Sequence, residues 1–391
     1  MPWKEVSVMS QRLEFVQMAS GEQANIRQLC RHFNISAPTA YKWLYRFQES
    51  GQHQNLLDQS RRPHHSPRRT ATEIEQVVID LRTAHPAWGG RKIRARMIAL
   101  GHAVVPQPST ITAILARHQL IEPSESAKRQ PFCRFEHPRP NDLWQMDFKG
   151  DFALDNGRCF PLTVLDDHSR FALGLLACPG QSTIPTQTAL REVFRRYGLP
   201  SRMTMDNGSP WGSSNKPAHT HFTIWLLRLG VAVSHSRPHH PQTQGKDERF
   251  HRTLQAELLR YATLRTLAQC QLEFDRWRDL YNCQRPHEAL GMQVPASRYV
   301  PSRRPFPQVL PPIEYDMADL VRKVRGWGHI KYKNHDYFIG QAFKGLHVAL
   351  RPTATDGLLD VYFCQHRLTQ INVAASTQTG SECVNHVSEQ V

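Results

Sequence analysis

Apolar residues recur at helical spacing through the first part of the chain. They predict three helices, around residues 13–16, at residues 26–33 and at residues 37–49. Ser36 is placed to cap the third helix, and Pro38 stands near its first position, where a missing N–H costs nothing. Short helices joined by a tight turn at residues 34–36 predict a helix-turn-helix domain over residues 1–57, although a plain three-helix bundle has the same pattern.

The same spacing continues in a second helical segment. It predicts helices at residues 73–83, 91–100 and 108–118. Residues 71–122 therefore resemble a second helix-turn-helix domain, although their apolar positions could serve packing alone. Polar, Pro-containing linkers are expected at residues 58–70 and 123–140. The first linker is rich in arginine, which suits either the minor groove of DNA or a solvated tether.

From residue 141 onwards the pattern becomes mixed. Short apolar runs predict a meander of three strands at residues 143–149, 158–165 and 171–178. Helical and extended segments then alternate, at residues 184–197, 201–205, 219–229 and 231–236, before two helices at 245–259 and 264–281. This order of elements is typical of an RNase H-like α/β core, which we assign to residues 141–300.

The last part of the chain contains short alternating β-like runs. Six of them lie within residues 318–374, separated by turn residues. This spacing predicts a small β-barrel of the SH3-like kind. An oligomerisation or packing role fits it as well as DNA binding through Lys331, Lys333, Lys344 and Arg351. Residues 375–391 are expected to be disordered. The predicted fold class is thus multidomain α+β, with helix-turn-helix domains, an α/β core and a C-terminal barrel.

The charge of the chain indicates a kind of partner. Lysine and arginine exceed aspartate and glutamate by 15, and the pI is near 9.7, which favours a polyanion. Residues 1–140 hold 20 basic and 11 acidic side chains. The eight cysteines have no short paired spacing, so a zinc ribbon or a disulfide framework is not expected. No apolar run reaches 18 residues, so we expect a soluble, cytoplasmic protein with no membrane contact.

Three acids suggest chemistry, because they fall where a strand, a strand end and a helix start are predicted: Asp147, Asp206 and Glu248. Carboxylates from separate segments can hold two divalent ions around a scissile phosphate, and Mg²⁺ prefers oxygen ligands. Asp247 is an alternative to Glu248, but it shares the apolar stripe of Phe250 and is more simply a first-turn acid. Other nearby acids fall in expected turns: Asp151, Asp155, Asp166 and Asp167. The arrangement predicts a nucleic-acid phosphoryltransferase.

Five motifs in this region resemble a known family. They are Trp144-Gln-Met-Asp147, Leu165-Asp-Asp-His-Ser-Arg170, Asp206-Asn-Gly208, His240-Pro-Gln-Thr-Gln-Gly-Lys-Asp-Glu-Arg-Phe-His-Arg-Thr-Leu254 and Tyr281-Asn-Cys-Gln-Arg-Pro-His-Glu-Ala-Leu290. In this order they resemble bacterial insertion-sequence transposases of the DDE type, whose catalytic core is like that of retroviral integrases. Two features depart from that family: Asp247 stands where an apolar residue is usual, and the interval from Asp206 to Glu248 is long.

The resemblance implies a reaction. Asp147 would bridge two Mg²⁺ ions, for which Mn²⁺ can substitute, while Asp206 and Glu248 would hold one ion each. The enzyme would hydrolyse a strand at the transposon end and join the freed 3′-OH to target DNA. Double-stranded DNA of the terminal inverted repeats and the target would be the partner, bound by a homodimer or larger homo-oligomer at the nucleoid.

Polar and basic positions near these segments predict the DNA contacts. These are Thr39, Tyr41, Lys42, Arg46, Arg61, Arg62, Arg68, Arg69, Lys246, Arg249 and Arg252. Two other functions use the same features. A catalytically silent DNA-binding regulator derived from a transposase would keep the fold without the reaction, although all three acids are present. An RNase H-like nuclease would cut without end specificity, but two helix-turn-helix domains would then be superfluous.

Overall fold

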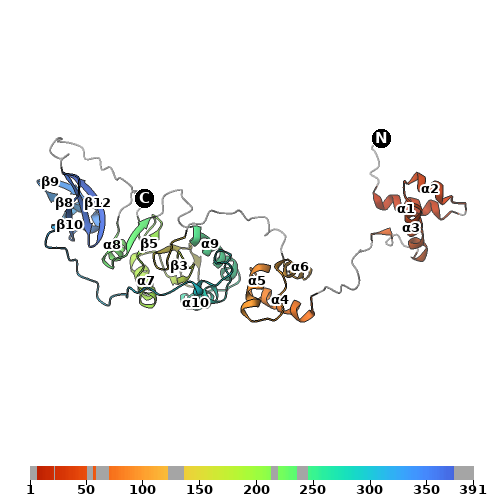
Figure 1. The fold of residues 1–391 in the computed structure, drawn as a ribbon, viewed down its shortest axis with the longest axis horizontal. Coiled ribbons are helices and arrows are strands. Elements are labelled where there is room, and N and C mark those ends of the chain that lie inside the picture. Colours follow the sequence, from red (N-terminus) through yellow and green to blue (C-terminus); the bar gives the residue numbers. More distant parts are fainter. Residues whose placement is uncertain are drawn as a thin grey trace. The chain divides into compact units, whose positions relative to one another are not determined.

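The computed structural model describes residues 7–21, 23–50, 56–58, 70–121, 136–212, 219–235 and 245–373. The chain divides into two compact units, Met1–Arg69 and Thr70–Val391, and each is described by itself (Figure 1). Most of the two predicted linkers and all of the predicted disordered tail lie outside the described residues. Those three assignments stay predictions.

The first unit contains a bundle of three helices: α1 (Val8–Ala19), α2 (Ile26–His32) and α3 (Ala37–Ser50). Its core joins Phe15 of α1 to Trp43 and Leu44 of α3, and all three side chains are buried. The Ser36 hydroxyl accepts a hydrogen bond from the Thr39 backbone N–H at 3.4 Å. The predicted helices and the predicted cap of the third helix are therefore confirmed.

The second unit begins with three further helices: α4 (Thr72–Ala84), α5 (Gly90–Ala99) and α6 (Pro108–Arg117). Trp88, in the break before α5, is fully buried in the apolar cluster that these helices share. A Cβ atom at Gly90 would lie 2.5 Å from the Pro108 carbonyl oxygen. Glycine is therefore required where α5 and α6 approach each other.

This helical domain contacts the α/β part of the same unit through a buried charged group. Lys92 of α5 lies 3.9 Å from Glu257, whose carboxylate also accepts a hydrogen bond from Arg285 at 2.8 Å. All three side chains are largely buried, and burial is the main reason that the pKa of Lys92 falls to about 7. Leu280 joins the apolar cluster of the helical domain. The contact is thus both ionic and apolar.

A six-stranded sheet forms the centre of the second unit. Its strands are β1 (Leu143–Phe148), β2 (Phe152–Ala153), β3 (Arg158–Asp166), β4 (Ala172–Cys178), β5 (Arg202–Met205) and β6 (Ala232–His235). Five of them follow the order β4-β3-β1-β5-β6, while the short β2 pairs with the start of β3. β1 is antiparallel to β3 and parallel to β5. The predicted meander and order of elements are confirmed; β2 was not predicted.

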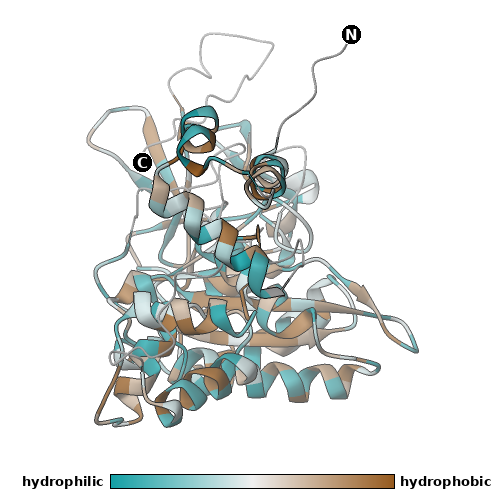
Figure 2. Ribbon diagram, turned by 90° about the vertical axis from the view of Figure 1, so that its right-hand side faces the viewer, coloured by the Kyte–Doolittle hydropathy of each residue, from teal (hydrophilic) through white to brown (hydrophobic). Residues whose placement is uncertain are grey.

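The two faces of the sheet are covered by different helices: α7 (Thr183–Tyr197), α8 (His221–Arg228), α9 (Gly245–Leu254) and α10 (Leu267–Cys283). Trp144 and Met146 of β1 pack in one cluster with side chains of α7 and α8. Cys159 and Leu165 of β3 pack in another cluster with α9 and α10. Figure 2 shows hydrophobic and hydrophilic bands on the helices, as expected for helices that bury one side.

The helix predicted over residues 245–259 is not uniform. α9 ends at Leu254 and continues as a π-helical turn, η3 (Gln255–Leu259). Phe250, on the predicted apolar stripe, and Leu254 are buried, whereas Leu258 is only partly buried. The π turn contains Glu257, which makes the contact with Arg285 described above. Hydrophobic spacing alone does not reveal such a turn, and π turns are frequent near functional sites.

The C-terminal segment contains the six predicted strands: β7 (Leu320–Lys323), β8 (His329–Tyr332), β9 (His335–Phe338), β10 (His347–Pro352), β11 (Leu358–Phe363) and β12 (His366–Asn372). Four of them form an antiparallel sheet in the order β12-β11-β10-β7, while β8 and β9 form a hairpin. The apolar cluster of this segment includes Ile224 and Leu227 of α8. Within the described residues the sheets do not close on each other, so the barrel is not confirmed.

Candidate active site

Asp147 stands in the central strand on the face covered by α9. Met146 and Phe148 belong to the cluster on the opposite face, and the alternation of side chains in a strand turns Asp147 away from them. Its partner in the antiparallel register is Thr163 of β3, whose hydroxyl donates to the Asp147 carbonyl oxygen at 2.9 Å. The predicted position of this acid in a central strand is confirmed.

Asp206 follows the last residue of β5, the parallel neighbour of β1. The register pairs Gln145 with Thr204, and Asp147 and Asp206 each come two residues later. Parallel strands end at the same edge of a sheet, so both acids lie at that edge. The predicted position of Asp206 at a strand end is therefore confirmed.

The carboxylate of Asp206 is held by two donors. The Gly208 backbone N–H donates to its Oδ1 at 2.9 Å, and the Trp211 indole N–H donates to the same atom at 2.5 Å. Trp211 is buried and stacks on Phe148, with ring centroids 5.3 Å apart. The aromatic pair thus connects β1 to the segment after β5 and fixes the direction of the Asp206 carboxylate.

Glu248 lies in the first turn of α9 and is exposed. The helix buries Asp247 and Phe250, so Glu248 stands beside the buried stripe, as predicted. The start of the helix is fixed by Lys246, whose ammonium pairs with the buried Asp167 carboxylate and donates to the Asp167 carbonyl oxygen at 3.2 Å. Because this anchor is two residues from Glu248, it determines where that side chain begins.

The two other acids act electrostatically on Asp147. Burial and then the charges of Asp206 and Glu248 raise the pKa of Asp147 to about 7. His251 of α9 lies close by, with its Nδ1 3.9 Å from the Asp147 carboxylate and its Nε2 2.8 Å from the Thr163 hydroxyl. Burial lowers the pKa of His251 to about 4, so at neutral pH the ring is uncharged. The negative charge around Asp147 is therefore not offset by this histidine.

These residues suit a hard divalent cation by their chemistry. All three acids offer oxygen ligands, and a cation would relieve the repulsion that raises the pKa of Asp147. Over the described ranges, however, no three His, Cys, Asp or Glu side chains are grouped closely enough to hold a metal ion. The donor chemistry fits magnesium, while the ligand geometry for one ion or two stays a prediction.

Asp247 lies in the first turn of α9, as predicted, but its surroundings were not predicted. Its side chain is fully buried, and neither carboxyl oxygen has a hydrogen-bond partner among the described residues. Burial, followed by the charges of Asp147 and Asp167, raises the pKa of Asp247 well above its usual range. Ionising this carboxyl in the core is therefore costly, and the charge of Lys246 offsets only part of that cost.

Asp166 and Asp167 were predicted to be turn residues, and the structure adds an anchoring function. Asp166 accepts a hydrogen bond from the Ser169 backbone N–H at 2.8 Å, as in a capped turn. Asp167 accepts from the Gln145 side chain of β1 at 2.8 Å and pairs with Lys246. It thus ties the central strand to the start of α9. Sequence reasoning missed this contact, because its partners lie 79 positions apart.

The predicted DNA contacts on α3 have two kinds of environment. Tyr41 and Lys42 are exposed, whereas Thr39 and Arg46 are half-buried. Lys42 and Arg46 both lie over the ring of the buried Trp43, at 4.7 Å and 5.0 Å from its centroid. These cation–π contacts concentrate positive charge on one helix.

The predicted DNA contacts on α9 are divided as well. Arg249 and Arg252 are exposed. The ammonium of Lys246 is instead largely buried against Asp167, and its contact with DNA stays a prediction. The four predicted contacts in the arginine-rich linker lie outside the described residues: Arg61, Arg62, Arg68 and Arg69.

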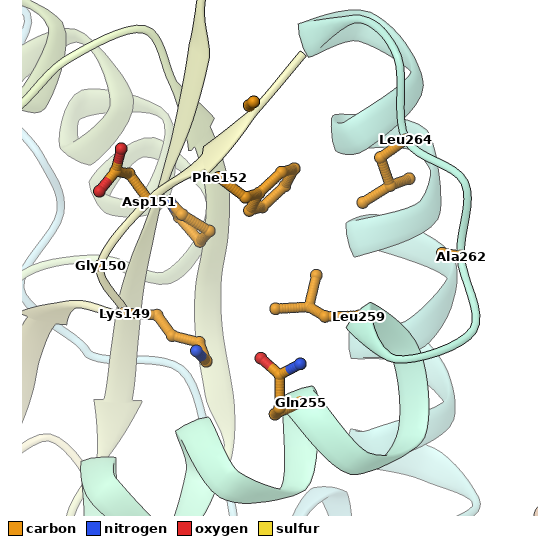
Figure 3. Close-up of a pocket in the computed structure, with 10 residues that line it drawn as sticks. Lys149, Gly150, Asp151, Phe152, Gln255, Leu259, Ala262 and Leu264 are labelled. Atoms are coloured by element: carbon orange, nitrogen blue, oxygen red, sulfur yellow. The ribbon is translucent and has the colours of Figure 1, made fainter.

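A hollow of about 260 Å³ lies between residues 149–153, which follow β1, and residues 255–264, which include the π turn. Figure 3 shows Phe152, Leu259 and Leu264 around one part of it, with Lys149 and Gln255 at its other end. Lys149 is two residues beyond Asp147 on the same chain segment. The hollow therefore joins an apolar wall to a positive charge close to the acids.

The order of the strands and the position of the acids define an integrase-like α/β core, and comparison with protein families agrees. Two integrase core domain families match residues 137–241 and 229–295, and the IS481 family transposase C-terminal domain matches residues 319–379. A helix-turn-helix domain family matches residues 11–64, and a homeodomain-like family matches residues 39–115.

Curated proteins of insertion elements are similar to part of the chain. The IS407 uncharacterized 31.7 kDa protein of Burkholderia multivorans is 31% identical over 40% of this chain and 54% of its own length. The IS476 uncharacterized 39.2 kDa protein of Xanthomonas euvesicatoria is 29% identical over 40% and 44%. The chain thus spans about half the length of these relatives. Its core and its C-terminal segment are thus similar to those of insertion-sequence transposases of the DDE type with a retroviral-integrase-like core.

Among solved structures, the HTLV-2 integrase catalytic core domain in complex with magnesium aligns with 41% of this chain and 97% of its own length. The identity is 15% and the TM-score 0.32.

Of the helices in the described part of the chain, none is long and apolar enough to cross a membrane.

Proposed function

We propose that the chain is an active transposase that hydrolyses a DNA strand at the ends of an insertion sequence and joins the freed 3′-OH to target DNA. The observation that carries the proposal is the parallel register of β1 and β5, which brings Asp147 and Asp206 to one edge of the sheet. The charge of Glu248 also raises the pKa of the Asp147 carboxyl, which supports its place in the same site. Three acids from three segments form the minimal set for this chemistry.

Asp147, Asp206 and Glu248 would hold two Mg²⁺ ions, for which Mn²⁺ can substitute. When bound, such ions activate the attacking oxygen and neutralise the charge that develops on the phosphate. The protein keeps the acids in place: Trp211 orients Asp206, and Lys246 fixes the start of the helix that carries Glu248. Both contacts prepare the ligands before DNA arrives, so little reorganisation is needed during the reaction.

The surroundings of the acids suit a DNA strand. Arg249 and Arg252 are exposed on α9 near Glu248, where their guanidinium groups can pair with phosphates. A strand that passes Asp147 would continue towards Lys149, which lines the hollow and supplies another positive charge. The neutral His251 adds no charge there and instead bonds to Thr163.

The helical domains would recognise the transposon ends. Exposed Tyr41 and Lys42 on α3 stand where the second helix of a helix-turn-helix meets the major groove. The second helical domain packs on the α/β core and would bring end DNA to the acids. Since two transposon ends have to be joined in one reaction, we expect a homodimer or a larger homo-oligomer.

A strand-transfer assay with purified full-length protein, a labelled transposon-end duplex and Mg²⁺ tests the proposal. Asp147→Asn should abolish cleavage and joining but leave end binding intact, whereas Asp155→Asn, on the exposed β2–β3 turn, should leave both unchanged. A wild-type protein that binds end DNA specifically but neither cuts nor joins it would favour the alternative, a silent regulator. Cutting that ignores the end sequence would indicate a nuclease.

A further inference from the structure

Trp327 is exposed to solvent in a way that sets it apart. Its side chain is 80% exposed, whereas the other six tryptophans of the described part of the chain are at most 6% exposed. An aromatic side chain that stays in water adds no buried apolar area, so Trp327 does not stabilise the core of its domain. Its position at the tip of a turn between β7 and β8 calls for another explanation.

The backbone around Trp327 is held in a conformation that favours glycine. Trp327 has a φ angle of +62°, in the left-handed region that bulky residues rarely adopt. The turn is closed by a hydrogen bond from the Arg325 N–H to the His329 carbonyl oxygen at 2.7 Å. Next to it, a Cβ atom on Gly328 would lie 2.5 Å from the Gly340 carbonyl carbon. The tip is therefore fixed on the neighbouring backbone, and such strain in a non-glycine residue is typical of functional positions.

Positive charge is concentrated in the segment that carries this tip. Residues 320–345 contain six lysine and arginine side chains and a single acid, Asp336. None of these six basic side chains forms an ion pair within the described ranges. Tyr332 lies among them, with Arg322 and Lys333 at 5.6 Å and 5.8 Å from its ring centroid. The surface thus alternates aromatic rings with uncompensated cations.

We propose that Trp327 stacks on an exposed nucleobase of bound DNA while the basic side chains around it contact the adjacent phosphates. The ring offers a face that any base can stack on, and the cations match the charge of the backbone on each side of that base. The inference rests on the proposed function, which makes DNA the partner of the chain. The exposed base can come from an unpaired end or from an opened step of an intact duplex, and the same chemistry serves both.

DNA affinity and thermal stability of the full-length protein, measured together, test this proposal. Trp327→Gly removes the ring and also relieves the backbone, because glycine adopts a φ of +62° without strain. We expect affinity to fall between about 5-fold and 150-fold, the range for loss of one base–aromatic stack. The melting temperature should stay the same or rise. Trp327→Phe should retain most of the affinity.

The matched control is Met317→Gly, which removes another fully exposed apolar side chain outside the basic cluster. It should leave affinity unchanged. Each variant is measured with a blunt duplex, with a duplex carrying an unpaired 5′ overhang and with single-stranded oligothymidylate. A loss confined to the last two identifies an unpaired base as the ligand, and an equal loss on the blunt duplex identifies an opened step.

Three results would overturn the inference. If wild-type protein binds no DNA, the proposed function fails and this inference fails with it. If wild-type protein binds but Trp327→Gly binds equally well to every DNA, only the stacking inference fails. If Trp327→Gly changes the oligomeric state, by sedimentation, while affinity per oligomer is unchanged, the surface is a contact between protein chains.

Discussion

Replacing Asp147 with asparagine should stabilise the metal-free protein while it removes the proposed reaction. Burial and two neighbouring acids raise the pKa of Asp147 from 3.8 to about 7. At about 1.4 kcal/mol for each unit of pKa, the difference sets an upper limit of about 4 kcal/mol on the cost of ionising this group in the folded protein. Because the side chain keeps 24% of its exposure, water screens part of this cost, and we expect about 2 kcal/mol.

The expected effect depends on pH in a defined direction. The folded pKa lies above the unfolded one, so the folded protein binds more protons than the unfolded chain between about pH 4 and pH 7. Stability therefore falls as the pH rises through this window, and the cost is complete above pH 7. Asparagine carries no charge, so the variant does not have this cost of ionisation. The gain in melting temperature should be about 4–8 °C at pH 8 and should shrink towards pH 5.

Thermal unfolding in EDTA from pH 5 to pH 8.5 measures this effect. Asp155→Asn, which changes an exposed carboxylate of the same region, should shift the melting temperature by less than about 2 °C at every pH. Adding Mg²⁺ should stabilise the wild-type protein and not Asp147→Asn, because the variant lacks the Asp147 carboxylate that would bind the ion. A variant no more stable than wild type at pH 8 in EDTA would refute the reasoning.

Two further substitutions test the contacts that orient the acids. Trp211→Phe keeps an aromatic ring but loses the N–H that holds Asp206, so single-turnover strand transfer should fall about tenfold to a hundredfold. The control is Trp144→Phe, which loses an indole hydrogen bond to Asn141 in the same apolar cluster, and equal effects of the two changes would contradict the assignment. Lys246→Met leaves the buried Asp167 carboxylate without the ammonium that pairs with it. The free energy of unfolding, measured by chemical denaturation, should fall by about 3–5 kcal/mol. A second change, Asp167→Asn, should restore much of this loss. An unchanged unfolding midpoint in the single variant would show that the pair is not needed for stability.

Elements with strong local signals could be predicted from the sequence. The strands carrying Asp147 and Asp206 are short apolar runs that end at polar or glycine-containing turns, and the structure has them at the predicted places. The six C-terminal strands were found because glycine and asparagine mark the turns between them. The side of α9 that is buried also follows from the spacing of Phe250 and Leu254.

Features that depend on contacts between distant segments were not predictable in this way. The ion pair of Lys246 with Asp167 needs the folded sheet to bring a turn and a helix together. The raised pKa of Asp247 follows from its complete burial, which a helical wheel indicates only as a tendency. Barrel closure depends on pairing between strands, and pairing is a property of the whole segment rather than of any one run.

The buried trio of Lys92, Glu257 and Arg285 has a consequence for anyone who recombines these proteins. A chimaera that takes its sheet from one relative and its α4–α6 helices from another would separate the lysine from the carboxylate that it evolved to meet. If one of the three residues lost its partner in this way, a charged side chain would remain buried without a counter-charge. A functional chimaera should therefore have its junction before residue 70, with α4–α6 and the sheet taken together from the same protein.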